Sequence, residues 1–173
     1  MAQQRSSTPV DERIERKLID YLQDALKMEH TVMRQLDVAI LTTRDADLLL
    51  ELKRHRAQTA THARRLRDRL EALGASVSLR RQMESIVTAL MKGGLDMVRG
   101  DKPSQNLRDG FVTEHLEIAA YETLERLAVR AGDAKTVSVA RRNRADEVAM
   151  ARKLGARWDR ALELTLDDSG IRR

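Results

Sequence analysis

Apolar residues recur three or four positions apart along most of the chain, which is the pattern of amphipathic helices. The first stripe of this kind runs from Ile14 to Ile40. It follows Pro9, a residue that suits the first position of a helix. The pattern therefore predicts one long helix of about 30 residues, beginning at Pro9 and ending near Thr43.

A second apolar stripe runs from Leu48 to Leu73. Asp45 precedes it as a candidate N-cap, and Gly74 follows it as a residue that commonly ends a helix. Only a short turn at about 43–45 separates the two stripes. A connection this short predicts that the first two helices form an antiparallel hairpin.

The next segment carries a weaker helical pattern. Ser78 opens a predicted third helix, which dissolves around Gly93 and Gly94. A loop at 99–103 follows. This whole connection of about 30 residues is long enough to cross from one hairpin to another.

The last part of the chain predicts a second hairpin. Ser104 is the candidate cap of a fourth helix that stops at Gly132. Asp133 starts a fifth helix, whose apolar stripe continues through Leu162 and includes Trp158 as a plug in the core. The turn at Gly132 is again short, so the fourth and fifth helices are expected to be antiparallel.

Two hairpins joined by one long crossover have the connectivity of ferritin-like four-helix bundles. The predicted fold class is therefore all-α, a ferritin-like four-helix bundle with an extra helix in the crossover. We expect a single domain over residues 9–163, a flexible arm at 1–8 and a frayed tail at 164–173.

Composition narrows the function classes. Cysteine is absent, which excludes disulfides, thiolate catalysis and cysteine-type metal sites. No run approaches the roughly 18 apolar residues of a membrane span, so we expect a cytoplasmic protein without membrane contact. The net charge is +5, and the basic runs at 64–69 and 141–144 permit nonspecific nucleic-acid contact. Acidic residues interleave with these runs, which favours a solvated helical face instead.

The second hairpin matches the first without gaps at an offset of 88 residues, with identities that exceed the chance level only modestly. This offset pairs Glu29 with Glu117 and Asp45 with Asp133, and the apolar stripes align as well. We infer that the two hairpins are related by a pseudo-two-fold axis.

Polar residues interrupt the apolar stripes at one level of the predicted bundle. At ~1.5 Å per residue, four of these residues lie about 22 Å from the nearest hairpin turn, namely Glu29, Gln58, Glu117 and Asp146. The other polar residues lie within about one helical turn of these four. Several carboxylates buried together require neutralisation, which metal ions supply, and carboxylate with imidazole suits iron or manganese. The alternative is that each acid reaches solvent at a stripe edge or pairs with an arginine. The candidate metal ligands are Glu29, Gln58, His62, Glu114, Glu117, Asp146 and Glu147.

Two further side chains lie near this level. His55 is expected to support a ligand or to lie at the core edge, with direct ligation the less favoured role. Tyr121 can hydrogen-bond a ligating carboxylate, or it can lie half-buried with its hydroxyl at the surface.

These segments resemble the YciF-like branch of the ferritin-like superfamily. The resemblance is carried by Met28-Glu29-His30, by 55–62 (HRAQTATH), by 143–147 (NRADE) and most specifically by 113–128 (TEHLEIAAYETLERLA). It covers about residues 18–158. It implies a four-helix bundle with a crossover helix, commonly a homodimer, associated with stress and suited to a di-iron or related centre.

Gln58 departs from this resemblance, which implies a glutamate before Thr59. A glutamine offers one neutral carbonyl oxygen where a carboxylate could bridge two metals. His62, one helical turn away, is the natural partial substitute. One metal, two metals or none are therefore all compatible with the sequence.

Three hypotheses follow. The first is a ferritin-like protein that binds iron, or alternatively manganese, and handles peroxide or oxygen. The second is a metal-free structural or interaction protein, in which Gln58 marks decay of the site. The third is a basic helical protein that coats nucleic acid. We favour the first, and the sequence does not decide whether the protein is an enzyme.

Overall fold

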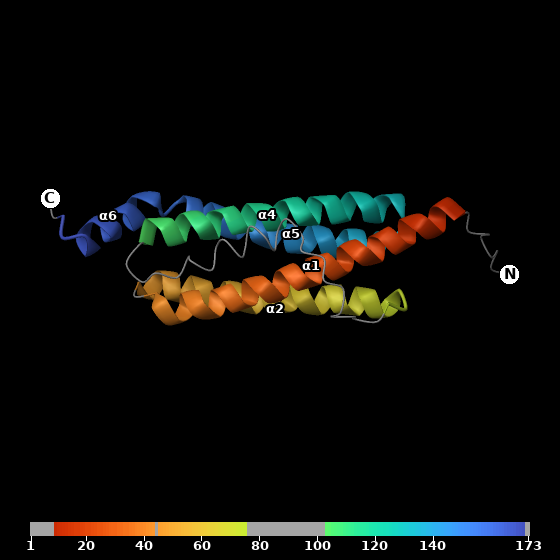
Figure 1. Cartoon of the computed structure of the whole chain (residues 1–173), viewed down its shortest axis with the longest axis horizontal. Coiled ribbons are helices and arrows are strands. Elements are labelled where there is room, and N and C mark those ends of the chain that lie inside the picture. Colours follow the sequence, from red (N-terminus) through yellow and green to blue (C-terminus); the bar gives the residue numbers. More distant parts are fainter. Residues whose placement is uncertain (1–8, 44, 76–102, 172–173) are drawn as a thin grey trace.

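The computed structural model describes residues 9–43, 45–75 and 103–171. The predicted helix from Ser78, the arm at 1–8 and the last two residues lie outside the described residues. The described residues form five α-helices and confirm the all-α class (Figure 1). These helices are α1 (Pro9–Thr42), α2 (Ala46–Ala72), α4 (Pro103–Arg130), α5 (Ala134–Gly155) and α6 (Trp158–Asp168).

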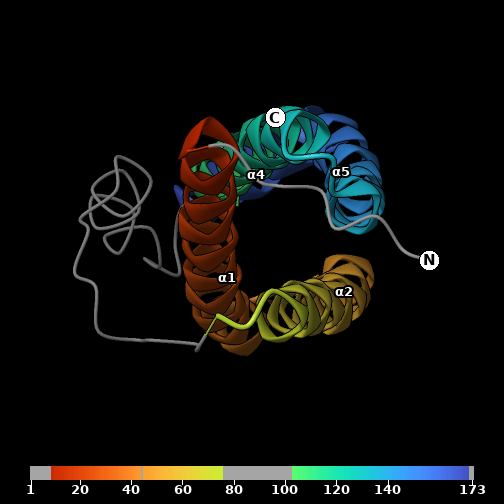
Figure 2. The ribbon, with the colours of Figure 1, turned by 90° about the vertical axis from the view of Figure 1, so that its right-hand side faces the viewer.

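The first four helices form two antiparallel hairpins, as the short turns predict. Helix α1 packs along α2, and α4 packs along α5. The hairpins meet where α1 contacts α4 and α2 contacts α5. Viewed along the bundle, the four helices surround a common axis (Figure 2). Side chains that face this axis from all four helices can therefore meet.

Local chemistry at the turns fixes where the helices begin. The Asp45 carboxylate accepts a hydrogen bond from the backbone N–H of Leu48 at 2.9 Å, which caps α2. The Asp133 carboxylate accepts one from the N–H of Thr136 at 3.0 Å, which caps α5. Gly132 has φ of 69°, a conformation that a residue with a Cβ rarely adopts. Each hairpin turn is thus held by the residues that predicted it.

The core of the bundle is aliphatic except at mid-height. Leucines dominate the buried hydrophobic positions, and alanines are the next most frequent. These apolar layers hold the four helices in register around the polar level described below. The most deeply buried leucines are Leu18, Leu22, Leu66, Leu70 and Leu124.

The C-terminal helical segment differs from its prediction. The expected single helix through Leu162 is broken, because α5 ends at Gly155 and α6 begins at Trp158. Trp158 is 39% exposed and rests edge-on against Phe111 at 5.6 Å, so it is not a core plug. The break removes Trp158 from the buried face of α5. Glycine is a poor helix former, which is consistent with a break at this position.

Helix α4 begins earlier, and helix α6 ends later, than expected from the sequence. Helix α4 begins at Pro103, one residue before the predicted cap Ser104. The backbone N–H of Ser104 instead donates to the Thr165 hydroxyl of α6 at 3.0 Å. Helix α6 runs to Asp168, so residues 164–168 are helical. Among the described helices, none combines the length and apolarity needed to cross a bilayer.

Replacing Asp133 by alanine should lower the free energy of unfolding by about 1–2 kcal/mol, because α5 loses its N-cap. Bonds from Thr136 and Arg69 outweigh burial and lower the pKa of Asp133. Its stabilisation is therefore present above the unfolded-state pKa and is lost as the pH falls. Urea denaturation at pH 7 and at pH 3 measures both effects.

The exposed Asp68 of α2 provides the control. Asp68→Ala should leave the free energy of unfolding within about 0.5 kcal/mol of the native value. Equal losses in the two variants would contradict the capping role of Asp133.

Candidate metal centre

Buried polar side chains from all four bundle helices converge at mid-height. Helix α1 supplies one, α2 supplies two histidines, α4 supplies two glutamates and α5 supplies one. None of the six is more than 3% exposed. The six residues are Glu29, His55, His62, Glu114, Glu117 and Glu147.

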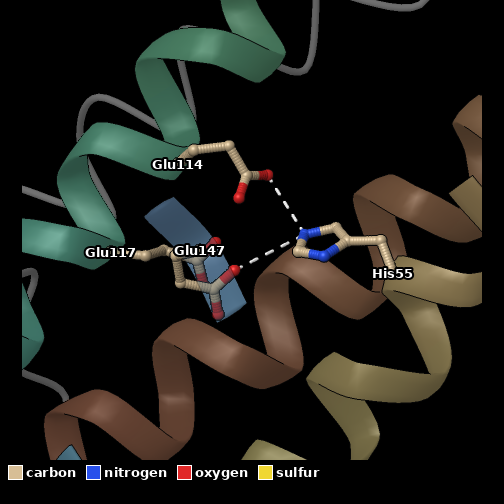
Figure 3. A group of neighbouring side chains, drawn as sticks. All are labelled: His55, Glu114, Glu117 and Glu147. Carbon is tan, nitrogen blue, oxygen red and sulfur yellow. Dashed lines mark ion pairs between the residues drawn. The ribbon is translucent and has the colours of Figure 1, made fainter. Parts of the chain in front are cut away.

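The first group within this cluster contains His55, Glu114, Glu117 and Glu147. One potential ligand atom from each lies within 4.8 Å of the others. His55 Nε2 is 3.1 Å from Glu114 Oε1 and 3.7 Å from Glu147 Oε2. Figure 3 shows the histidine ring directed at both carboxylates, with Glu117 reaching toward Glu147 from the α4 side. Three carboxylates and one imidazole thus face a common space.

The second group contains Glu29, His62 and Glu147, again with one ligand atom of each within 4.8 Å of the others. His62 Nδ1 lies 2.8 Å from Glu147 Oε1 and 3.6 Å from Glu29 Oε1. Glu147 therefore belongs to both groups, facing His55 with one oxygen and His62 with the other. The cluster has two overlapping sets of potential ligands joined by one carboxylate.

Many polar atoms of the cluster lack a hydrogen-bond partner among the described residues. They include both oxygens of Glu117, both oxygens of Glu147 and both ring nitrogens of His55. The close nitrogen–oxygen approaches at Glu147 therefore lack hydrogen-bond geometry. Unpartnered buried polar atoms are rare in folded proteins, and each is unfavourable by about 1–3 kcal/mol. A cation among these atoms would satisfy them, so the residues fit a metal.

Burial makes the ionised carboxylates unfavourable without a cation. Burial raises the pKa of Glu117 well above its usual value, and the neighbouring Glu147, Glu29 and Glu114 add to the shift. Burial also raises the pKa of Glu114, to about 7, against the opposing influence of His55. Without metal, protons on these groups provide part of the neutralisation.

The pKa values of the two histidines are also raised, which favours their charged form, whereas the raised pKa values of the glutamates favour the neutral form. Burial opposes the charged form of His62, but attraction to Glu147 and Glu29 outweighs it and raises the pKa to about 10. Burial likewise opposes the charged form of His55, but Glu114 outweighs it and raises the pKa. Carboxylate partners thus favour imidazolium, and a cation must displace these protons to bind the rings.

The structure brings together five of the seven predicted ligands, namely Glu29, His62, Glu114, Glu117 and Glu147. The other two lie elsewhere. Gln58 is on the exposed face of α2. Asp146 is half-buried and contacts His62 Nε2 at 3.0 Å, on the side of the ring away from the cluster.

The displacement of Gln58 and Asp146 is a one-residue difference in helical register. Thr59 and Glu147, each one residue later, are the buried positions, and they are related by the same offset of 88 residues. Adjacent helical residues point about 100° apart, so one position decides which side chain faces the axis. At the buried position of α2 that corresponds to Glu147, the chain therefore has Thr59 and no carboxylate. The Thr59 hydroxyl donates to the His55 carbonyl at 3.0 Å.

Two features of the site exceed what the sequence analysis favoured. His55 lies within the cluster; its spacing of seven residues before His62, two helical turns on one face, was the available signal. Tyr121 is fully buried, and its hydroxyl donates to Glu29. Burial and Glu29 raise the pKa of Tyr121 well above its usual value, which keeps the hydroxyl a donor.

The fold and the cluster together define a ferritin-like helical bundle with a buried histidine and glutamate cluster that could hold a metal. The chain belongs to the DUF892 family, described as a domain of unknown function, whose pattern matches residues 13–165. No curated protein matches the chain.

Several solved structures share this fold. A Xanthomonas campestris pv. campestris protein has a TM-score of 0.76 at 20% identity, with 91% of this chain and 99% of that chain covered. The Escherichia coli stress protein YciF has a TM-score of 0.71 at 22% identity, covering 87% and 96%. YcfI, a putative structural protein from Rhodopseudomonas palustris, has a TM-score of 0.67 at 22% identity, with 90% of this chain and 98% of that chain covered. The family resemblance of the sequence and the ferritin-like bundle are confirmed.

Replacing Glu117 by methionine should raise the free energy of unfolding of the metal-free protein by about 1–3 kcal/mol. The reason is that an apolar side chain of similar length removes two buried oxygens without partners. Urea denaturation with EDTA present measures the change.

Glu125→Met is the matched control on the same helix. Glu125 Oε1 lies 2.6 Å from Arg141 Nε, and its Oε2 lies 2.7 Å from Arg144 Nη2. This variant therefore loses two ion pairs and should not gain stability. A destabilised Glu117→Met protein would show that Glu117 has a favourable partner in the metal-free state.

Proposed function

We propose that this protein binds two metal ions in the core of its bundle, with iron as the first candidate and manganese as the alternative. The two positions are His55, Glu114, Glu117 and Glu147, and Glu29, His62 and Glu147. The observation that carries the proposal is the set of buried carboxylate oxygens without hydrogen-bond partners, which two overlapping ligand groups share.

The donor chemistry favours these metals. Carboxylate and imidazole suit iron and manganese, whereas the absence of cysteine excludes thiolate-held metals. Glu147 would bridge the positions through its two oxygens, since each oxygen faces a different histidine. Bound iron would supply redox chemistry toward oxygen or peroxide. The protein's own residues exclude bulk water, because every proposed ligand is buried.

A role in stress response rests on the family resemblance and on the printed description of the Escherichia coli relative as a stress protein. The proposal that the protein forms a homodimer rests on the family resemblance alone. A nucleic-acid-coating role is less favoured. Arginines of both basic runs form ion pairs within the bundle, among them Arg69 with Asp133 and Arg141 with Glu125.

Anaerobic loading with Fe(II), desalting and metal analysis by mass spectrometry test the proposal. We expect close to two iron atoms per chain in the native protein. Glu147→Gln should lose most of this iron because the shared residue serves both positions. A parallel loading with Mn(II) tests the alternative metal.

Gln58→Ala is the control, since its side chain is exposed and should leave the stoichiometry unchanged. Native protein that keeps its helical circular dichroism but retains neither iron nor manganese would overturn the proposal.

A further inference from the structure

Arg65 of α2 lies at the start of two chains of polar contacts that lead into the cluster. Its Nη1 donates to Asn143 Oδ1 at 2.8 Å and lies 3.7 Å from Asp146 Oδ2. Both partners belong to α5, in the other hairpin. The Arg65 side chain is 30% exposed, so a group at the surface connects to the buried centre.

The first chain ends at Glu29. Asn143 is fully buried, and its Nδ2 donates to the Tyr121 hydroxyl at 2.9 Å. The Tyr121 hydroxyl in turn donates to Glu29 Oε1. Arg65 fixes the orientation of the Asn143 amide by occupying its oxygen, which leaves the amide nitrogen directed at Tyr121. The chain therefore determines which hydrogen bond the Glu29 carboxylate accepts.

The second chain ends at His62. Asp146 Oδ2 contacts His62 Nε2 at 3.0 Å, while His62 Nδ1 faces Glu147 and Glu29. A carboxylate on the outer nitrogen holds a proton there and leaves the inner nitrogen available to a metal. Arg65 Nη1 lies 3.7 Å from the same Asp146 oxygen and so holds this carboxylate by charge attraction.

Both chains act on one ligand group only. Glu29 and His62 are its two unshared members. In the other group, His55 has no hydrogen-bond partner for either ring nitrogen among the described residues, and Glu117 has none for either oxygen. The two proposed metal positions therefore differ in how their ligands are held.

We propose that Arg65 is the positioning residue of the metal position formed by Glu29, His62 and Glu147, which it supports through Asn143 and Asp146. This inference rests on the proposed function. Such outer partners orient metal ligands, and their loss typically lowers metal affinity by about 10- to 100-fold. The position formed by His55, Glu114, Glu117 and Glu147 does not depend on Arg65.

The test compares native protein with Arg65→Gln, using Zn(II) as a diamagnetic probe. Competition with a chromophoric chelator gives the two affinities, and ¹⁵N NMR of the histidine rings reports which position is filled. We expect the variant to keep one zinc with native affinity and to bind the second about 10- to 100-fold more weakly. At free zinc concentrations buffered near the native dissociation constant, the metal-bound signal should persist for His55 and be strongly reduced for His62.

Two further variants separate positioning from general destabilisation. Arg69 also joins α2 to α5, donating to Asp133 at 2.8 Å and to Thr136 at 3.1 Å, but it does not touch the cluster. Arg69→Gln should keep both zinc ions. Asp146→Ala breaks only the chain through His62 and should weaken the same position as Arg65→Gln does. If Arg65→Gln fails to fold, Arg65→Lys takes its place as the test of Arg65, because lysine does not reproduce the guanidinium geometry.

The outcomes distinguish this inference from the function on which it rests. Native binding of two zinc ions with unchanged affinities in Arg65→Gln would overturn the role of Arg65 and leave the metal centre standing. Equal weakening of both positions, or the same loss in Arg69→Gln, would also overturn it. Native protein that binds no zinc would overturn the metal centre and this inference with it.

Discussion

The arrangement of the bundle depends on the need to neutralise carboxylates that α1, α4 and α5 bury at one level, beside two histidines of α2. Glu29, Glu114, Glu117 and Glu147 converge among leucine layers that offer no solvent. In the metal-free state, His55 and His62 offset part of the negative charge, and the raised pKa of Glu117 favours its neutral form. Several carboxylate oxygens still lack hydrogen-bond partners within the described part of the chain. An apolar layer would be more stable at this height. A cation at this level could satisfy these oxygens, whereas an apolar layer would remove them.

The internal repeat explains why the two proposed positions are unequal. Residues 88 apart share burial, as Glu29 does with Glu117, yet the chemistry of several pairs has diverged. Glu147 corresponds to Thr59, so only the second hairpin supplies a shared carboxylate. His55 corresponds to Asn143, so the first hairpin has a buried imidazole at the position where the second has a buried amide. One set of ligands is consequently richer in carboxylates, and the other depends more on its hydrogen-bonded supports.

Sequence periodicity sufficed for the hairpins and for the level of the site, because stripes and short turns report helix faces and lengths directly. It did not resolve which of two adjacent residues faces the axis. The predicted ligands include Gln58 and both Asp146 and Glu147, whereas hairpin packing buries Thr59 and, of the α5 pair, only Glu147. It also missed the break after Gly155, since the apolar spacing continues across it. Register and helix breaks are set by contacts between helices, which a single periodic pattern does not contain.

The contact between the two hairpins differs on the two sides of the bundle, and this bears on access to the site. Helix α2 meets α5 through charged and polar groups, including Arg65 with Asn143 and Lys153 with Glu51. Two arginines of the basic run at 64–69, Arg65 and Arg69, thus join the hairpins. The side chains of Asp146 and Arg65 are both partly exposed at this contact. Arg65 therefore joins the two hairpins and also contacts Asp146, which lies against His62 Nε2, so one side chain serves both the packing of the hairpins and the support of one ligand group.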